Sequence, residues 1–425
     1  MKIIVHRGTH QIGGVATEIS SAQTRIIIDM GDELSLDPDF VPEQLDIPGV
    51  TDGNCECDGV LFTHNHGDHI GQYINIHEDI PLYIGELSKK IQLLSDWKGT
   101  QQNKQRIQKA NTFKPGEPFM IGDLRITPFL IDHSSCDSYM FLIETEGKRI
   151  LHTGDFRTHG YHGKALPKIL DKLVGKVDVL ITEGTTLSRP QETVMTEHDL
   201  QQKFKEYIKD FPYVFVLCAA TNLERVCGLT HAVPRGKYFI CDEYQKKLLM
   251  LIEKFRGSYS PLYRNHKVTL YGDNLLDRFR EKGFLMTVRA NGRFKDIISK
   301  FDPAKSIVLY SLWDGYRTRS GSTIPDFLSS CKWEHLHTSG HASLDDIRMV
   351  IEKTKPSYTI PIHTENPEVL QRSCPTSNVL LLKDREELIV YRKKFGLIWS
   401  KYRKGKDELC TQQNKKTLLY QKRYH

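Results

Sequence analysis

The hexapeptide HNHGDH, residues 64–69, constrains this chain more than any other stretch, because it crowds three histidines and an aspartate into one turn. The apolar run VLF precedes it, so we expect a β-strand to deliver the turn to the edge of a sheet. His64 and His66 stand two residues apart in an extended segment, so both can face one metal ion. Asp68 and His69 follow where the chain can turn towards a second ion. Imidazole nitrogens and carboxylate oxygens suit zinc, with manganese as the alternative at oxygen-rich positions.

Three further strand-like segments end in residues of the same kind. FLIDHSS ends at His133, KRILHTGDF at Asp155 and YTIPIHTE at His363. A single histidine after a strand is more often a packing residue, but together these three complete what a two-metal site at a sheet edge requires. The carboxylate of Asp155 is the candidate to bridge both ions. With 18 histidines in 425 residues, chance would produce the pattern of the HNHGDH turn in only about one chain in several hundred.

The pattern of expected strands and helices changes twice along the chain. At 425 residues it is long enough for two domains. Up to residue 186, short β-branched runs alternate with turns, whereas residues 187–335 alternate amphipathic helices with buried strands, the pattern of a doubly wound parallel sheet. After residue 335 we expect a helix over residues 344–354, the strand SYTIPIH and a further strand within NVLLLKDREELIVY.

The motifs HNHGDHIG, IDHSS, HTGDF, ITEGTT, HTSGHAS and PIHTE, in this order, resemble the metallo-β-lactamase fold. Within that fold they resemble the β-CASP family of nucleic-acid-processing enzymes, and most closely its ribonuclease J group. The first motif points to the superfamily, and SGHAS with PIHT points to the branch. The resemblance implies an α/β architecture: a metallo-β-lactamase αββα sandwich of residues 1–186 and 336–392, with a β-CASP α/β domain inserted at 187–335. Residues 393–425 would then form a basic C-terminal tail.

The resemblance also implies a role for each ligand. One ion would be held by His64, His66 and His133, the other by Asp68, His69 and His363, with Asp155 between them. The expected cofactors are two zinc ions, with manganese as the alternative. Either Asp68 or Asp155 would orient the attacking water.

Two residues outside the ligand set receive catalytic roles from the same resemblance. Glu183 would orient a histidine beside the metal ligands. His341 would contact the scissile phosphate or the leaving oxygen, and it lies just before a helix with Ser343 as the expected cap, where a helix N-terminus attracts phosphate. The neighbouring His335 and His337 are expected to be packing residues.

The expected activity is hydrolysis of RNA phosphodiester bonds by a metal-activated water, as a 5′–3′ exonuclease, an endonuclease or both. A histidine at position 363 is associated with the RNA-acting members of the family. The glycine- and serine-rich phosphate pocket of the ribonuclease J group has only a poor match here, in LYSLWDGYRTRSGSTIP. We take Ser320 and Ser322, together with His341 and Ser343, as candidate substrate contacts. Cations of the inserted region are also candidates for a substrate groove: Arg289, Arg293, Lys295, Arg317 and Arg319.

Three alternatives compete with this interpretation. A small-molecule hydrolase of the same superfamily would have no inserted domain, so residues 187–335 count against it. A non-catalytic RNA-binding subunit would usually lack some metal ligands, and here every position is filled. A DNA-acting β-CASP nuclease is a variant of the main hypothesis.

Charge and cysteine content indicate which partners and which cellular compartment to expect. The net charge of +6 comes from residues 400–425, which hold eight Lys/Arg and two Asp/Glu, because the rest of the chain has 51 of each sign. Three tyrosines lie among these cations, so the tail is expected to bind RNA, preferably single-stranded, or else to act as a solubilising terminus. The sequence shows neither a signal peptide nor a run of membrane length. Nine scattered cysteines suit a reducing compartment, so a cytoplasmic location is expected. A homodimer is left open.

Overall fold

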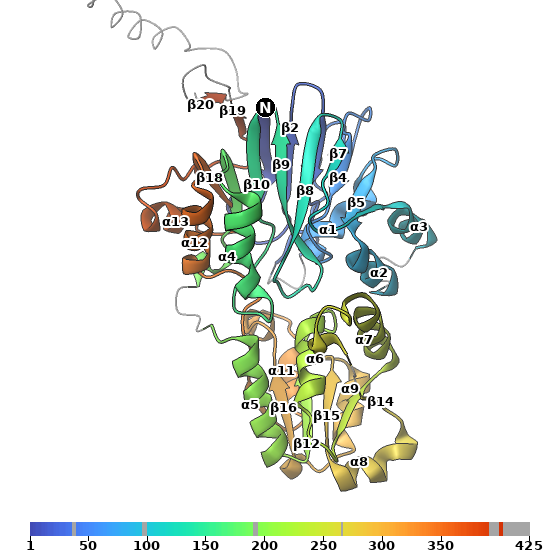
Figure 1. The fold of residues 1–425 in the computed structure, drawn as a ribbon. Helices are drawn as coiled ribbons and strands as arrows, with labels where there is room; N and C mark the ends of the chain where they lie inside the picture. The colour runs from blue at the N-terminus through green and yellow to red at the C-terminus, as the bar shows by residue number, and fades with distance from the viewer. Residues whose placement is uncertain (36–39, 96–99, 190–193, 265–266, 391–398, 403–425) are drawn as a thin grey trace, which may run out of the picture.

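The computed structural model describes residues 1–35, 40–95, 100–189, 194–264, 267–390 and 399–402. Two β-sheets build one body of the molecule, and a third sheet builds the other (Figure 1). The eight strands of the first sheet run in the order β20-β19-β1-β2-β3-β4-β5-β6. Their bounds are β1 (Lys2–Arg7), β2 (Ala16–Ser20), β3 (Arg25–Ile28), β4 (Gly59–Leu61), β5 (Leu82–Gly85), β6 (Asn111–Phe113), β19 (Glu387–Val390) and β20 (Trp399–Tyr402).

The second sheet has six strands in the order β18-β11-β10-β9-β8-β7. They are β7 (Phe119–Ile121), β8 (Leu124–Ile131), β9 (Ser138–Thr145), β10 (Lys148–His152), β11 (Val179–Glu183) and β18 (Tyr358–Ile362). β8 and β10 both pair antiparallel with β9, while β11 and β18 run parallel to β10. Four strands of this sheet therefore end at the same edge.

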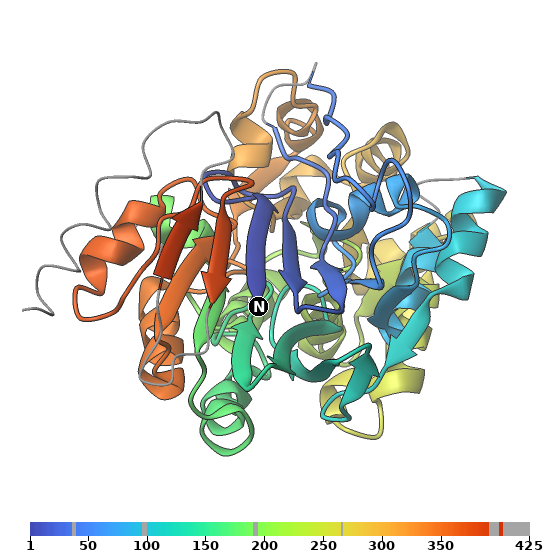
Figure 2. The ribbon, with the colours of Figure 1, turned by 90° about the horizontal axis from the view of Figure 1, so that it is seen from above.

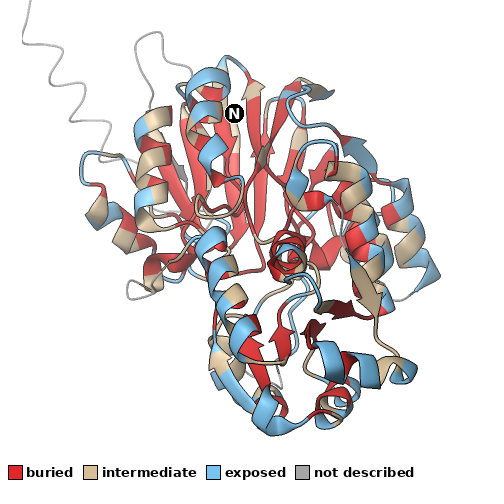
Figure 3. Ribbon diagram, turned by 60° about the horizontal axis from the view of Figure 1, so that its bottom comes forward, coloured by how far each residue is buried: buried red, intermediate tan, exposed pale blue. Residues whose placement is uncertain are grey.

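The first two sheets pack face to face, and helices cover their outer faces (Figure 2). Val5 and Ile19 of the first sheet share a buried core with Phe141 and Ile181 of the second. The longer of these covering helices bury one face and leave exposed residues on the other (Figure 3). The covering helices are α1 (Gly67–Ile70) and α3 (Gln101–Lys109) on the first sheet, and α4 (Leu166–Ile169), α12 (Leu344–Thr354) and α13 (Pro367–Ser373) on the second. The αββα sandwich expected from the sequence is confirmed.

The third sheet is parallel throughout, in the order β14-β13-β15-β12-β16-β17, as the alternating pattern predicted. Its strands are β12 (Tyr213–Leu217), β13 (Tyr238–Cys241), β14 (Val268–Leu270), β15 (Phe284–Val288), β16 (Ser306–Tyr310) and β17 (Lys332–His335). One face is covered by α5 (Glu197–Asp210), α6 (Leu223–Ala232) and α7 (Glu243–Arg256), the other by α8 (Leu276–Lys282), α9 (Gly292–Ser299) and α11 (Ile324–Leu328).

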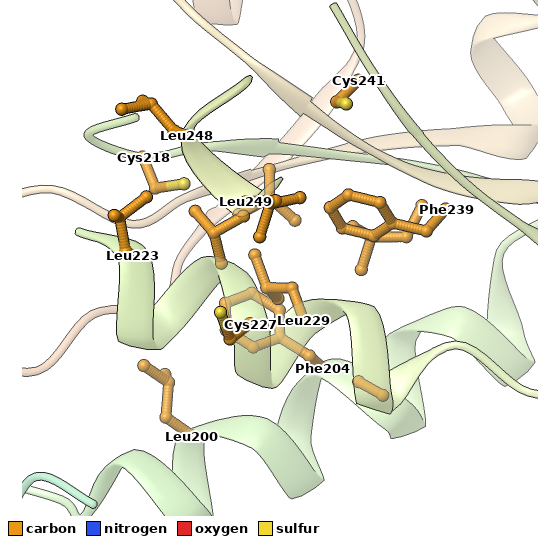
Figure 4. Packing of buried hydrophobic residues seen from close by; sticks show 14 of the residues in the cluster. Leu200, Phe204, Cys218, Leu223, Cys227, Leu229, Phe239, Cys241, Leu248 and Leu249 are labelled. Carbon is orange, nitrogen blue, oxygen red and sulfur yellow. The ribbon is translucent and has the colours of Figure 1, made fainter. Parts of the chain in front are cut away.

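Helix α5 shows how the sequence builds this unit. The Thr196 hydroxyl accepts a hydrogen bond from the Asp199 amide and so caps the helix. Leu200, Phe204 and Ile208 recur every four residues and are almost fully buried, and their helix packs on α6 and β12 (Figure 4). The same core includes Leu87 and Ile91 of α2 (Glu86–Ser95), so apolar packing joins the sandwich to the third-sheet unit.

The further strand expected near the end of the sandwich is confirmed, and a turn precedes it. Within NVLLLKDREELIVY the structure has a strand only at Glu387–Val390, preceded by a turn at residues 384–385. Arg385 has a positive φ of 64°, a conformation that a strand does not accommodate. Residues 403–425, most of the expected tail, lie outside the described residues. Among the helices that the structure describes, none combines the length and the apolar character needed to cross a bilayer.

Candidate metal centre

The predicted ligands meet at the strand ends of the sandwich. His64 and His66 follow β4, His133 follows β8, Asp155 follows β10 and His363 follows β18. Because β8, β10 and β18 end at one edge, residues far apart in the chain reach a single place. All seven predicted ligands belong to groups whose nitrogen and oxygen atoms lie within 4.8 Å of one another.

Three imidazoles form the first group. The Nδ1 atom of His66 lies 3.1 Å from Nε2 of His64 and 3.2 Å from Nε2 of His133. Burial lowers the pKa of all three side chains, that of His66 to about 4. At neutral pH these imidazoles are therefore uncharged, and their converging nitrogens offer lone pairs to a cation.

Asp68, His69 and His363 form the second group. The His363 Nε2 atom lies 3.2 Å from Asp68 Oδ2. Burial works against ionisation of Asp68, but the hydrogen bond from His363 and the charge of His69 outweigh it and lower the pKa of that carboxyl. Asp155 stands between the two groups, because its Oδ2 lies 3.0 Å from His69 Nε2 and 3.9 Å from His133 Nε2. The uncharged imidazoles of the first group together with the ionised carboxylates of Asp68 and Asp155 fit divalent cations such as zinc.

Protein oxygens fix the orientation of four of these histidines. Each directs Nδ1 to such an oxygen, which turns Nε2 inward. The pairs are His64 with Thr63 Oγ1 (3.0 Å), His69 with Asp29 Oδ2 (2.8 Å), His133 with the Gly340 carbonyl (2.6 Å) and His363 with Thr185 Oγ1 (2.7 Å). The sequence pattern predicted none of these four partners. Only Asp29, which ends the apolar run RIII, carried a signal that could have been noticed.

Backbone strain accompanies this arrangement. Asp29 and His363 have positive φ angles of 61° and 52°, a conformation uncommon outside glycine. The His363 amide donates to the Gly8 carbonyl at 2.7 Å. Strained backbone of this kind persists where the surroundings over-determine it, and it gathers at functional sites.

His341 and Glu183 lie beside the ligands. The His341 Nδ1 atom is 3.1 Å from Glu183 Oε2 and 3.6 Å from Asp155 Oδ2. Burial opposes protonation, but the carboxylates of Glu183 and Asp155 outweigh it and raise the pKa of His341 to about 9. Glu183 also accepts hydrogen bonds from the Phe156 and Ala342 amides. The His341 side chain is 21% exposed while that of Glu183 is 1% exposed, so the buried Glu183 holds a ring that is partly accessible from outside.

The serines predicted as substrate contacts have different surroundings in the structure. Ser343 caps α12, and Asp346 completes a capping box. The Ser322 hydroxyl donates to the Tyr316 carbonyl at 2.7 Å, and Ser320 is exposed.

Several of the candidate groove cations are engaged within the protein. The contacts are Arg289 with Asp242, Lys295 with Asp326, Arg317 with Asp314, and Arg293 over the Phe294 ring. The ring of His335 stacks on that of His337, at 6.0 Å between centroids.

Two family models match the chain. One, described as a beta-lactamase superfamily domain, matches residues 24–250. The other, described as a Zn-dependent metallo-hydrolase RNA specificity domain, matches residues 330–372, a segment that contains His341 and His363.

Among similar proteins, ribonuclease J of Helicobacter pylori is 25% identical over 97% of this chain. Ribonuclease J of a Synechocystis species is 22% identical over 90% of it. The chain spans 64% of the length of both relatives. A crystal structure of a protein of unknown function from Enterococcus faecalis superposes with a TM-score of 0.73 at 20% identity, covering 91% of this chain and 99% of that one.

Proposed function

Because this chain belongs to the β-lactamase superfamily, we propose that it is a metal-dependent ribonuclease that hydrolyses RNA phosphodiester bonds. One observation carries the proposal. The segment that matches an RNA specificity domain, residues 330–372, supplies His363 to the ligand cluster and His341 to a position beside it. The ribonuclease J relatives support the same activity. Residues 187–335 would form the inserted domain. The substrate would be single-stranded RNA, and the protein would act in the cytoplasm.

The residues of the cluster would hold two zinc ions, with manganese as the alternative. One ion would lie among His64, His66 and His133, the other among Asp68, His69 and His363, with Asp155 shared. When bound, such ions supply Lewis acidity and lower the pKa of water, which phosphodiester hydrolysis at neutral pH needs.

The chain's own side chains perform the remaining tasks. His341, protonated at neutral pH and partly exposed, donates a proton to the leaving 3′ oxygen or a hydrogen bond to the phosphate. Glu183 positions His341 through its carboxylate. Asp68 or Asp155 accepts a hydrogen bond from the attacking water and orients it.

A digestion panel tests this function. Zinc- or manganese-loaded protein is incubated with 5′-monophosphate RNA, 5′-triphosphate RNA, circular RNA and single-stranded DNA. We expect cleavage of RNA but not of DNA, abolished by chelator and by Asp155→Ala. The exposed Asp345 provides the matched control, because Asp345→Ala removes a carboxylate away from the cluster. Cleavage of circular RNA would establish an endonuclease. Equal turnover of DNA would contradict the RNA preference, and hydrolysis of a lactam or thioester without nuclease activity would contradict the proposal.

A further inference from the structure

Trp313 and Tyr316, in the segment that follows β16, pack together with Arg189, which follows the short helix η4 (Thr185–Ser188). The Trp313 and Tyr316 rings lie 5.5 Å apart and nearly perpendicular, at 85°. The Arg189 guanidinium lies 4.0 Å from the centre of the Trp313 ring. Tyr316 is 38% exposed, so part of its surface is open to a ligand.

This cluster lies next to the metal centre. The Thr185 hydroxyl contacts His363 Nδ1, and Arg189 ends the short helix η4 (Thr185–Ser188) that begins there. Burial raises the pKa of the Tyr316 phenol, and the Asp68 carboxylate raises it further, while Arg189 and Arg319 lower it. The phenol is therefore within electrostatic reach of the Asp68 carboxylate and of two guanidinium groups.

The backbone beneath the two rings is held in place before any ligand arrives. The Tyr310 hydroxyl donates to the Trp313 carbonyl at 2.8 Å, and the Tyr316 amide donates to the same carbonyl at 3.1 Å. The Ser322 hydroxyl holds the Tyr316 carbonyl. The Trp313 ring lies directly over Gly315, where a Cβ atom would come within 2.2 Å of the indole, so only glycine permits this packing.

We propose that Trp313, Tyr316, Arg189 and Arg319 form a subsite for one unpaired nucleotide of the substrate, with its base stacked on Tyr316 and a phosphate facing the guanidinium groups. The inference rests on the proposed function and adds a binding determinant to it. Aromatic rings accept the faces of all bases, and arginine neutralises phosphate and stacks on rings. A duplex hides the base faces, so the subsite favours single strands.

Equilibrium binding without turnover tests the subsite. The probe is a fluorescein-labelled ten-nucleotide single-stranded RNA, titrated with chelator-treated full-length protein. Stacking on an aromatic ring accounts for about 1–3 kcal/mol per base, so Tyr316→Leu is expected to weaken binding by about 5- to 150-fold. Tyr316→Phe retains the ring and should bind close to wild type. The control is Trp333→Leu. It removes another partly exposed indole, which lies on β17 and packs against Arg317, and it should leave the affinity for RNA unchanged.

Oligonucleotides with a single abasic residue, scanned along the sequence, separate stacking from a general loss of structure. At one position the missing base should weaken wild-type binding but add no further loss to Tyr316→Leu. Equal affinities of the Leu and Phe variants, or equal losses at every abasic position, would overturn the subsite. Base-dependent binding by a protein that cleaves no RNA would leave the subsite standing while refuting the ribonuclease. Normal cleavage with unaltered affinity in Tyr316→Leu would refute the subsite and leave the ribonuclease standing.

Discussion

At the scale of single residues, the first group of the candidate metal centre depends on three imidazoles that stay neutral inside a buried cluster. His64 is fully buried, and burial together with neighbouring imidazoles holds its pKa well below the usual range. Its Nε2 atom faces His66, so its removal takes away one of the three nitrogens expected at the first ion. We predict that His64→Ala loses about one metal ion per chain and all measurable cleavage. Elemental analysis after dialysis measures the metal, with the peripheral His77→Ala as control; full metal occupancy in His64→Ala would contradict the assignment.

His341 differs from the ligands in having a partly exposed ring and a carboxylate partner. Loss of a general acid typically costs about 10²- to 10⁴-fold in rate. We therefore predict that His341→Ala lowers kcat within this range while metal content and folding stay at wild-type level. His335→Ala, on the exposed end of β17, should leave kcat unchanged. Metal loss in His341→Ala would instead make this histidine a ligand.

Residue type and position were enough to predict that these seven side chains would come together, but not what orients them. The ligands follow strands, and strand ends are visible in the sequence as the limits of apolar runs. The partner of His133 is the Gly340 carbonyl, and a backbone oxygen leaves no trace in the amino-acid pattern. Thr185 belongs to ITEGTT, but nothing in that motif shows that its hydroxyl reaches His363, 178 residues away.

At the scale of elements, the HNHGDH turn packs so closely on its neighbour that one methyl group would displace it. A Cβ atom added to Gly31 would lie 1.6 Å from the Asp68 carbonyl oxygen. We predict that Gly31→Ala lowers the free energy of unfolding by about 3 kcal/mol and reduces metal content, because Asp68 and His69 must move. Gly292→Ala is the matched control: its Cβ meets nothing within 4 Å at the start of α9. Denaturant unfolding with metal analysis compares the two; equal stability of both variants would show that the turn shifts freely.

A buried ionic network joins α5 to the metal centre. The carboxylate of Glu197 contacts Arg157 at 2.8 Å and Arg225 at 2.6 Å. The two arginines also donate to the Ser339 and Thr338 carbonyls, just before His341. The network thus supports the segment that presents Gly340 and His341 to the site.

The charge on Glu197 should contribute to stability in a defined pH range. Burial opposes its ionisation, but the two arginines outweigh it and lower the pKa of Glu197 from 4.5 to about 2. A lowered pKa stabilises the fold above the unfolded value, and this contribution of about 3 kcal/mol is lost as pH falls from about 4.5 to 2. We predict that Glu197→Gln is less stable than wild type by about this amount at pH 7, and that the difference narrows below pH 4.5. Glu206→Gln, exposed on the same helix, should change stability by less than about 0.5 kcal/mol; a gap for Glu197→Gln that is independent of pH would contradict the ionic origin.

At the scale of the whole molecule, the proposed site requires both bodies of the protein. The sandwich supplies the ligand cluster, while Trp313 and Tyr316 come from the third-sheet unit. The alternating pattern of residues 187–335 predicted a parallel sheet. It did not predict the strand order or the packing of α2 against α7, because these arise from long-range apolar contacts that alternation does not encode. The shared core of Leu87 with Leu249 fixes one body against the other and so brings the aromatic cluster to the metal centre.

The chain's excess positive charge gives a last prediction at this scale. Residues 403–425 carry seven Lys/Arg and two Asp/Glu, whereas the body is close to neutral. Because β20 pairs with β19 in the first sheet, truncation after Tyr402 keeps that strand and removes most of the basic tail. Each cation that neutralises a phosphate of a single strand contributes about 0.7 to the slope of log affinity against log salt. We predict that the truncated chain binds RNA more weakly at low salt and has a slope shallower by about 0.7 for each phosphate that the tail neutralises.

Fluorescence titrations of single-stranded RNA at several salt concentrations measure this slope, with full-length protein and the truncated chain compared in parallel. A second variant, with the seven cations replaced by glutamine, separates charge from chain length. If the tail acts through phosphates, the glutamine variant should match the truncated chain at every salt concentration, because the released counterions and not the peptide itself determine the slope. Identical slopes for full-length and truncated protein would instead make the tail a solubilising terminus and leave RNA affinity to the two folded bodies.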